Sequence, residues 1–182
     1  MTLIKSTKKQ DIESSARFSV APMMDWTDRH CRYFHRQFTT RSLLYTEMVA
    51  AAALVHGKAY HLLDYSKEEY PLALQLGGSD PIQLADAAAI GEAHGYGEIN
   101  LNVGCPSDRV QSGSFGAVLM KNPKLVAACC KAMKKSTSVD ITVKCRIGVD
   151  DQDPEQILPE FLNQIYYSGV SRVIIHARKA IL

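Results

Sequence analysis

Residues 99–107 read Ile-Asn-Leu-Asn-Val-Gly-Cys-Pro-Ser, and this stretch carries the densest signal in the sequence. It begins as a short apolar run that carries two asparagines, and it continues into a glycine, a cysteine and a proline. Short runs rich in Val, Ile and Leu are typical of buried parallel strands. Because polar and reactive side chains follow directly, the stretch predicts a strand whose carboxyl end faces a functional site.

The same pattern, a short apolar run followed by a polar turn and an amphipathic stretch, recurs along the chain. It predicts repeated βαβ units with parallel strands. Asp80-Pro81 and Asn122-Pro123 are good helix starts, and Gly95 and Gly169 stand where helices should end. We expect strands over residues 18–23, 43–48, 72–76, 99–103, 141–146 and 173–176, and helices over residues 28–38, 49–55, 81–94, 123–136 and 154–168.

Alternating strands and helices fit either a (β/α)8 barrel or an open doubly wound sheet, and two features favour the barrel. The Gly-x-Gly-x-x-Gly fingerprint of dinucleotide-binding sheets does not follow the first strand. Nearly every strand also ends in polar or reactive side chains, which a barrel gathers at one mouth and an open sheet spreads along an edge. These side chains are Glu47, Gln75, Asn102 with Cys105, Lys144 with Arg146, and His176 with Arg178.

The length indicates an incomplete barrel. A full barrel has eight strands and typically about 250 residues. This chain has 182 residues, and the pattern accounts for about six strands. We therefore predict an α/β protein with a TIM (β/α)8 barrel that is truncated after about six strands. Residues 1–16 are expected to form an N-terminal extension, and residues 17–182 the N-terminal part of the barrel.

The composition is that of an ordinary globular protein, with 46% hydrophobic and 22% charged residues. The net charge of +2 neither demands nor excludes a nucleic-acid partner. Five cysteines without a Cys-x-x-Cys pair argue against a disulfide framework and a structural zinc site. A polar N-terminus and only short apolar runs argue against a signal peptide and a membrane span. We expect a cytoplasmic protein with no metal and no membrane partner, and the oligomeric state stays open.

Cys105 is the cysteine whose neighbouring residues suggest a role in chemistry. Pro106 restricts its backbone, and Gly104 is expected to permit a close backbone approach or unusual dihedral angles. A free thiol is mostly protonated at neutral pH, so a thiol held at a barrel mouth can act as a general acid. The remaining cysteines lack such a setting and are expected to be small, buried apolar residues: Cys31, Cys129, Cys130 and Cys145.

Residues 99–117 resemble the signature of the tRNA-dihydrouridine synthases, Asn-x-Gly-Cys-Pro followed at fixed spacing by Gly-Ala. Every fixed position matches, from Asn102 to Ala117. The similarity runs from about Arg17 onward and is to the A-type subfamily, the 20/20a synthases. Further matching stretches are residues 21–23, 25–29, 44–48, 75–78, 107–111 and 176–179. One departure is Ile181, where the resemblance leads us to expect tryptophan.

The resemblance implies a barrel that binds FMN, followed by a helical domain that helps to grip tRNA. We expect the last strands and that domain to lie outside the 182 residues. Cys105 matches the proton donor, Asn102 matches a contact to the target uridine, and Arg178 is expected to meet the tRNA. A lysine beside the flavin would stabilise its reduced, anionic form. The positions that match flavin contacts are Pro22, Met23, Met24, Gln75, Lys144 and His176.

The implied reaction reduces uridine to 5,6-dihydrouridine in the D-loop of tRNA, at positions 20/20a. NADPH reduces FMN, hydride passes to C6 of the uracil, and Cys105 protonates C5. The base must leave its stack to be reached. Trp26 and Tyr33 are more often core residues than RNA-stacking ones, so we expect both in the core. Arg109 and Lys179 either meet phosphates or are solvated, and Glu47 has no assigned role.

Two alternatives stay open. An FMN barrel that reduces a free pyrimidine would share the strand layout, although the Asn-x-Gly-Cys-Pro-Ser context together with residues 25–28 favours tRNA. The other alternative is a non-catalytic, truncated remnant, because the loops after strands seven and eight hold the cofactor phosphate in such barrels. The activity and the FMN binding of the isolated chain are therefore open.

Overall fold

The computed structural model describes residues 12–107 and 113–182. Residues 1–11 of the expected extension and residues 108–112, which include Arg109, lie outside the described part. The described strands form one parallel sheet in chain order, β1-β2-β3-β4-β5. They are β1 (Leu44–Ala50), β2 (Leu72–Gly77), β3 (Glu98–Val103), β4 (Asp140–Cys145) and β5 (Arg172–Ile175). The α-helices are α2 (Arg29–Phe38), α3 (Ala51–Val55), α4 (Pro81–Ala93), α6 (Pro123–Ser136) and α7 (Pro154–Tyr166). The 3-10 helices are η1 (Tyr60–Leu63), η2 (Lys67–Glu69) and η3 (Gly116–Lys121).

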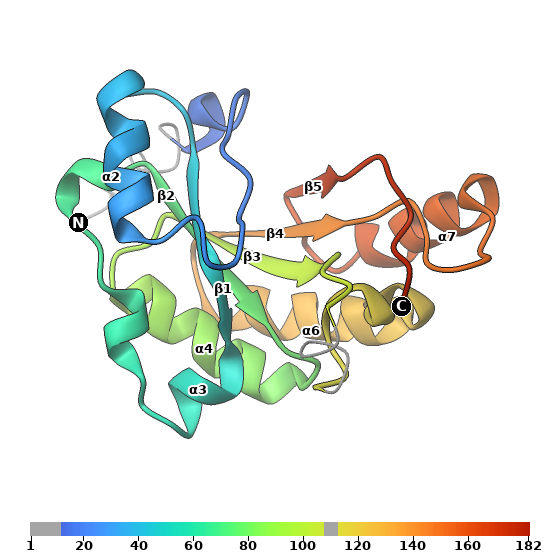
Figure 1. The fold of residues 1–182 in the computed structure, drawn as a ribbon. Coiled ribbons are helices and arrows are strands. Elements are labelled where there is room, and N and C mark those ends of the chain that lie inside the picture. The colour runs from blue at the N-terminus through green and yellow to red at the C-terminus, as the bar shows by residue number, and fades with distance from the viewer. Residues whose placement is uncertain (1–11, 108–112) are drawn as a thin grey trace.

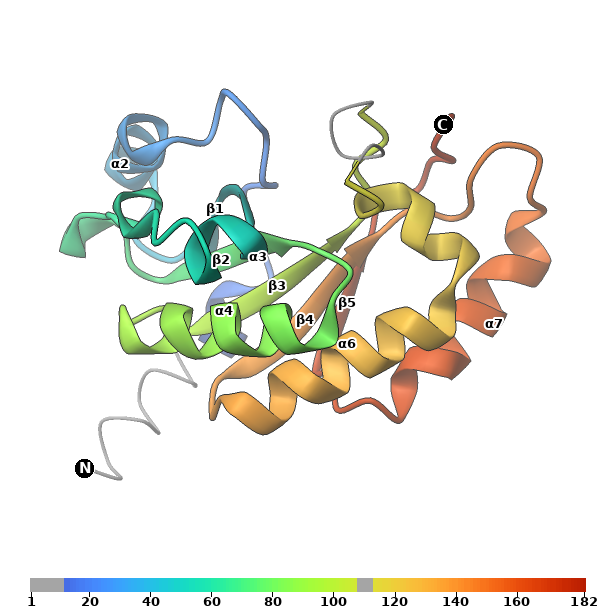
Figure 2. The same cartoon turned by 90° about the horizontal axis from the view of Figure 1, so that it is seen from below.

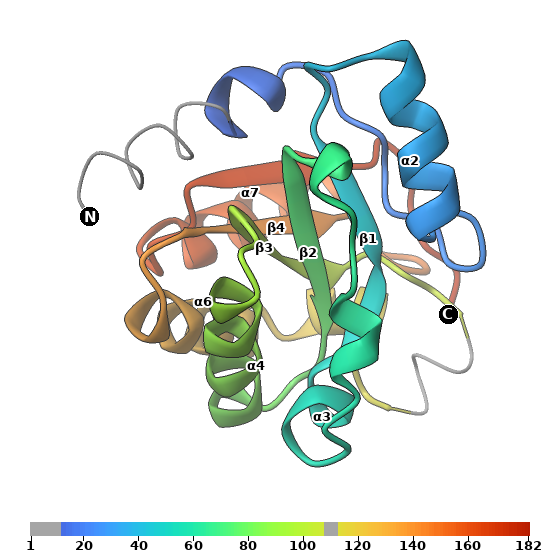
Figure 3. The same ribbon diagram turned by 90° about the vertical axis from the view of Figure 1, so that its left-hand side faces the viewer.

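Helices α4, α6 and α7 cover one face of the sheet (Figures 1 and 2). Each of them connects two neighbouring parallel strands, so every crossover has the βαβ form. The strands turn progressively from β1 to β5, which curves the sheet (Figure 3). Consecutive parallel strands in a curved sheet, with helices on its outer face, are the arrangement of a (β/α)8 barrel. The predicted α/β class is confirmed.

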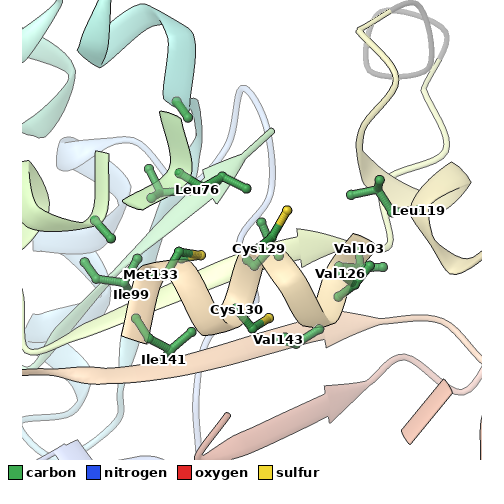
Figure 4. Packing of buried hydrophobic residues seen from close by; sticks show 14 of the residues in the cluster. Leu76, Ile99, Val103, Leu119, Val126, Cys129, Cys130, Met133, Ile141 and Val143 are labelled. Atoms are coloured by element: carbon green, nitrogen blue, oxygen red, sulfur yellow. The ribbon is translucent and has the colours of Figure 1, made fainter. Parts of the chain in front are cut away.

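The two faces of the sheet differ in chemistry, because side chains alternate along each strand. The face under the helices is apolar and forms the main core, part of which is drawn in Figure 4. That figure shows α6 packed on β3 and β4 through Ile99, Val103, Val126, Cys129, Cys130, Met133, Ile141 and Val143. The opposite face carries polar side chains, among them Gln75 and Asn102. The interior of a barrel is usually filled by Val, Ile and Leu, so the polar side chains on this face differ from the usual apolar filling.

The strand expected over residues 18–23 does not form. Ser19 makes a single parallel bridge to Leu43, and the N–H of Val20 donates to the carbonyl of Leu43 at 3.0 Å. Pro22 then supplies no N–H for a ladder, so the pairing does not continue. The described sheet accordingly has five strands rather than six, and residues 18–23 contribute only this bridge.

Helix α2 buries arginines instead of apolar side chains. Arg32 donates from Nε to Glu69 Oε2 at 2.6 Å in a buried ion pair. Arg36 donates to four backbone carbonyls, those of Thr39, Ser42, Glu69 and Pro71. The aromatic residues of this region therefore face outward. The expectation that Trp26 and Tyr33 lie in the core is wrong, because they are 73% and 48% exposed.

The predicted helix ends are confirmed at several places. The side chains of Asp80 and Asn122 cap α4 and α6, and Gly95 and Gly169 have positive φ values of 96° and 88°. The helix expected from residue 49 begins later, because β1 stays paired with β2 as far as Ala50. In the described ranges, no helix combines the length and the apolar character needed to cross a membrane.

Candidate active site at the carboxyl ends of the strands

Asn102 is bonded to two other predicted site residues, Gln75 and Cys105. Its Nδ2 donates to Oε1 of Gln75 at 2.9 Å, so the ends of β3 and β2 are linked by their side chains. Its Oδ1 accepts two backbone N–H groups, from Gly104 at 3.0 Å and from Cys105 at 2.9 Å. One amide therefore shapes the turn that follows β3 and fixes where Cys105 leaves the strand.

Cys105 is half-buried on a turn that is held from several sides. Its carbonyl accepts the N–H of Ala117 at 2.8 Å, which links the two halves of the sequence signature. Its Sγ lies 3.5 Å from Oγ of Ser107. Arg146 donates from Nε to the carbonyl of Gly104 at 3.0 Å. The thiol thus sits at the carboxyl end of β3 on a fixed backbone, as predicted from the sequence.

Gly104 does not have the role that we expected. Its φ lies outside the left-handed region, in contrast to four other glycines of the described chain. A Cβ at this position would lie 3.5 Å from the backbone of Lys144 and Cys145, which is an ordinary van der Waals distance. Neither an unusual dihedral angle nor a close backbone approach within the described structure therefore requires a glycine here.

The other cysteines follow the expected pattern with one exception. Cys129, Cys130 and Cys145 are buried, and burial raises the pKa of each of these thiols to about 12. The expectation of burial is wrong for Cys31, which is half-buried on α2 with its Sγ 3.5 Å from Nδ1 of His35. Partial burial and the charge of Asp28 raise the pKa of Cys31 as well.

Basic side chains gather at the carboxyl ends of β4 and β5. Lys144 is the register partner of Asn102 across β3 and β4, so both side chains lie on the same face. Burial, and then the charge of Arg146, lowers the pKa of Lys144. The pKa of His176 is lowered by desolvation and then by Arg146, Lys144 and Arg178. Like charges this close repel one another, so the cluster favours an anionic ligand.

The backbone ties the end of β5 to the end of β4. The N–H of His176 donates to the carbonyl of Cys145 at 2.9 Å, and the N–H of Ile147 donates to the carbonyl of Arg178 at 3.3 Å. His176 and Arg178 are exposed beyond the strand, whereas Lys144 is half-buried within the sheet. The structure therefore brings these three predicted site residues to one place.

Pro22, Met23 and Met24 lie on the segment between the Ser19 bridge and α2. Met23 and Met24 are 45% and 47% exposed, and the hydroxyl of Thr27 accepts the N–H of Met23 at 2.9 Å. The N–H of Asp25 donates to Oε1 of Glu47 at 2.6 Å, which ties this segment to β1. Glu47, to which the sequence assigned no role, is the side chain that holds the segment.

Sequence reasoning missed the polar residues deeper in the sheet. They connect to Gln75 and Asn102 through buried hydrogen bonds, and they include Tyr45, Glu98, Asn100, Thr142 and Arg172. A signal for some of them was present in the sequence. Glu98, Asn100 and Asn102 alternate with apolar residues, and this period of two in a buried strand indicates one polar face.

The described residues offer oxygen, nitrogen and thiol groups for an organic ligand. Amides from Gln75 and Asn102 can both donate and accept hydrogen bonds. Beside them lies half-buried Lys144, whose lowered pKa an anionic partner would raise again. Within the described chain, no group of three or more His, Cys, Asp or Glu side chains is arranged to hold a metal ion. The amides and Lys144 together could hold a polar organic ligand that carries negative charge.

Comparison with known proteins identifies the family of the chain. The family model described as Dihydrouridine synthase (Dus) matches residues 19–181. The tRNA-dihydrouridine(20/20a) synthases of Shigella flexneri and Escherichia coli (strain K12) are each 60% identical to the chain over 174 residues, which are 95% of it. The enzyme of that name from Xanthomonas campestris pv. campestris is 57% identical over 166 residues, or 91% of the chain. These matches cover 51%, 50% and 50% of the relatives, so the chain spans about half of their length.

Proposed function

Because the chain belongs to the dihydrouridine synthase family, we propose that it forms the part of a tRNA-dihydrouridine synthase that carries the acid for uridine reduction. The product is 5,6-dihydrouridine in the D-loop of tRNA, at positions 20/20a. The observation that carries the proposal is the position of Cys105, fixed at the end of β3 by two hydrogen bonds from the backbone to Asn102. The protein acts in the cytoplasm.

The residues present fit FMN. Lys144 and the other cationic side chains suit its anionic reduced form, and the amide of Gln75 suits its polar ring edge. When bound and reduced by NADPH, FMN supplies the hydride that C6 of the uracil receives. The side chains that would hold it are Pro22, Met23, Met24, Gln75, Lys144 and His176.

Residues of the chain itself bind the uracil, protonate it and attract the RNA. Asn102 still has an Nδ2 hydrogen beyond the one given to Gln75, and it can donate that hydrogen to a uracil carbonyl. The Cys105 thiol gives its proton to C5. Arg178, exposed beside the site, attracts the tRNA backbone. Asn102 thus orients the base, Cys105 protonates it, and Arg178 attracts the RNA.

The test is complementation. The coding sequence, with whatever continues it in frame, is expressed in a cell that lacks its own dihydrouridine synthases, and D-loop dihydrouridine is measured by mass spectrometry. We expect dihydrouridine to return with the natural sequence and with Cys31→Ala, and to be lost with Cys105→Ala. A folded, flavin-loaded protein that restores none would defeat the tRNA proposal. Reduction of free uracil or uridine would then favour the free-pyrimidine alternative, and no reduction of either would favour a non-catalytic protein.

A further inference from the structure

A buried line of hydrogen bonds runs through the polar face of the sheet, from the amino end of β3 to its carboxyl end. It starts at Glu98, whose Oε1 accepts the hydroxyl of Thr142 at 2.6 Å. Thr142 Oγ1 accepts Nδ2 of Asn100 at 2.9 Å, and Asn100 Oδ1 accepts Nε2 of Gln75 at 2.8 Å. Gln75 Oε1 accepts Nδ2 of Asn102 at 2.9 Å. The line ends at the backbone N–H groups that Asn102 Oδ1 accepts.

The carboxylate of Glu98 gives this line its direction. Glu98 is fully buried and ion-paired with Arg172 of β5, and it also accepts the hydroxyl of Tyr45 at 2.9 Å. Burial lowers the pKa of Arg172, but the attraction of Glu98 and Tyr45 outweighs burial and the net shift is upward. In this arrangement the carboxylate of Glu98 accepts hydrogen bonds from Arg172, Tyr45 and Thr142.

Each following group then has one orientation available. Since Glu98 only accepts, the hydroxyl of Thr142 must donate to it and therefore accepts from Asn100. Asn100 must turn its Nδ2 toward Thr142 and its Oδ1 toward Gln75. Gln75 in turn presents Oε1 to Asn102. If any amide were flipped, two buried donors or two buried acceptors would face each other. Each group left without a hydrogen bond would lower the free energy of unfolding by roughly 1–3 kcal/mol.

We propose that Asn100 and Thr142 are positioning residues that transmit the polarity of Glu98 to Asn102 and so hold Cys105 in place. Asn102 presents its oxygen to the N–H groups of Gly104 and Cys105 because the amides before it permit no other orientation. The structural part of the proposal stands without any assumption about the reaction. Its catalytic part rests on the proposed function, in which Cys105 is the acid.

The line can be cut at Thr142 with little change of shape. Thr142→Val removes the hydroxyl that links Glu98 to Asn100, whereas Thr142→Ser keeps it. Hydrogen exchange of individual backbone amides in the 182-residue chain, measured by NMR, reports on the far end of the line. We expect Thr142→Val to speed exchange of the Gly104 and Cys105 amides by about tenfold, because Asn102 is then free to turn.

Matched measurements separate positioning from general loosening. Thr142→Ser and the exposed control Thr40→Val should leave both amides within about twofold of the natural protein. The amide of Ala117, which holds Cys105 from the other side, should be protected in every variant. Equal rates in Thr142→Val and the natural protein would overturn the proposal, as would equal effects of valine and serine at position 142, or faster exchange throughout the sheet.

A measurement on the unaltered protein covers the case in which the valine variant does not fold. Asn100 donates an Nδ2 hydrogen to Thr142, and Gln75 donates an Nε2 hydrogen to Asn100. These two hydrogens should exchange more slowly than the side-chain amide hydrogens of the exposed Gln37. Side-chain exchange as fast as that of Gln37 would exclude the buried line.

If dihydrouridine is formed, Thr142→Val should lower kcat about tenfold with KM unchanged, and Thr142→Ser should restore kcat. If no dihydrouridine is formed, the exchange results still decide the positioning proposal.

Discussion

The ring of Phe115 lies directly against the α-carbon of Gly77 at the end of β2. A Cβ built on Gly77 would be 2.8 Å from Cε2 of Phe115 and 2.8 Å from Sδ of Met48. Phe115 immediately precedes η3, whose Ala117 holds the carbonyl of Cys105. The ends of β1 and β2 and the turn that carries the thiol therefore meet at one glycine.

Gly77→Ala should strain this meeting point. We expect the free energy of unfolding to fall by about 1–3 kcal/mol, because Phe115 and Met48 must both move to admit a methyl group. Urea unfolding measures it. Gly104→Ala is the matched control, because its Cβ meets only ordinary contacts at 3.5 Å. The control should lie within about 1 kcal/mol of the natural protein, and equal losses in the two variants would contradict the packing seen here.

The cysteines should divide into two classes by reactivity. In the folded protein at pH 8 we expect iodoacetamide to modify Cys31 and Cys105 only, because the others are buried and their pKa values are raised to about 12. Unfolding in urea should expose all five. Intact-mass spectrometry counts the adducts and peptide mapping assigns them. A third adduct on the folded protein would show that a thiol in the sheet or in α6 is accessible.

Asp28 should control the reactivity of Cys31. Its charge helps to raise the pKa of that thiol, so Asp28→Asn should lower the pKa and speed alkylation of Cys31 at pH 8. Asparagine also caps helices well, so α2 should remain intact. The alkylation rate of Cys105 in the same sample is the internal control. A change in both rates would point to a loosened fold rather than to an electrostatic effect.

His176 should titrate according to its cationic neighbours. Its pKa is lowered by desolvation and by Arg146, Lys144 and Arg178, so the imidazole loses its proton below the usual pH of 6.5. Removing a positive neighbour should raise that pKa, by a larger amount for Arg146→Gln than for Arg178→Gln. Salt should raise it too, by screening. NMR titration of the imidazole measures these shifts. Arg29→Gln on α2 is the control, and a pKa that is insensitive to Arg146→Gln, to Arg178→Gln and to salt would exclude the cluster.

Arg36 should be a major source of stability. Its guanidinium donates to four carbonyls in a place with little water, and burial lowers its pKa. Arg36→Met leaves those carbonyls without this donor, so we expect a loss of roughly 3–5 kcal/mol in the free energy of unfolding. Arg29→Met, at an exposed position on the same helix, should cost less than about 0.5 kcal/mol. Thermal or urea unfolding compares the two.

Much of the fold could be predicted because the strands obey simple rules. Short apolar runs between capped helices indicated β2 to β5, and α4, α6 and α7, nearly to the residue. The failures have local causes. Residues 18–23 are apolar enough for a strand, but Pro22 interrupts the ladder. Trp26 and Tyr33 were expected in the core as aromatic residues, yet Arg32 and Arg36 find carboxylate and carbonyl partners and occupy the interior beside them.

The residues of the site could be predicted, but the hydrogen bonds between their side chains could not. Gln75, Asn102, Lys144 and His176 each stand at or beside the end of an apolar run, and parallel strands bring such ends together. Which oxygen or nitrogen each amide presents depends on partners from other strands. Asn102 and Gln75 are 27 residues apart, and Asn100 and Thr142 are 42 apart. No local pattern specifies those pairings, so Tyr45, Thr142 and Arg172 gave no signal.

The buried carboxylate of Glu98 has a consequence for how this protein can be altered. It contacts side chains from β1, β4 and β5 while standing on β3, and the amides around the thiol take their orientation from it. Sheet assembly and thiol placement therefore depend on one group at the opposite end of the strand. A directed-evolution library aimed at new substrates should vary the exposed rim and keep positions 98, 100, 142 and 172 constant. Mutations of Glu98 or Arg172 would weaken the sheet and displace the thiol together, whereas Thr142→Val would displace the thiol with little effect on the sheet.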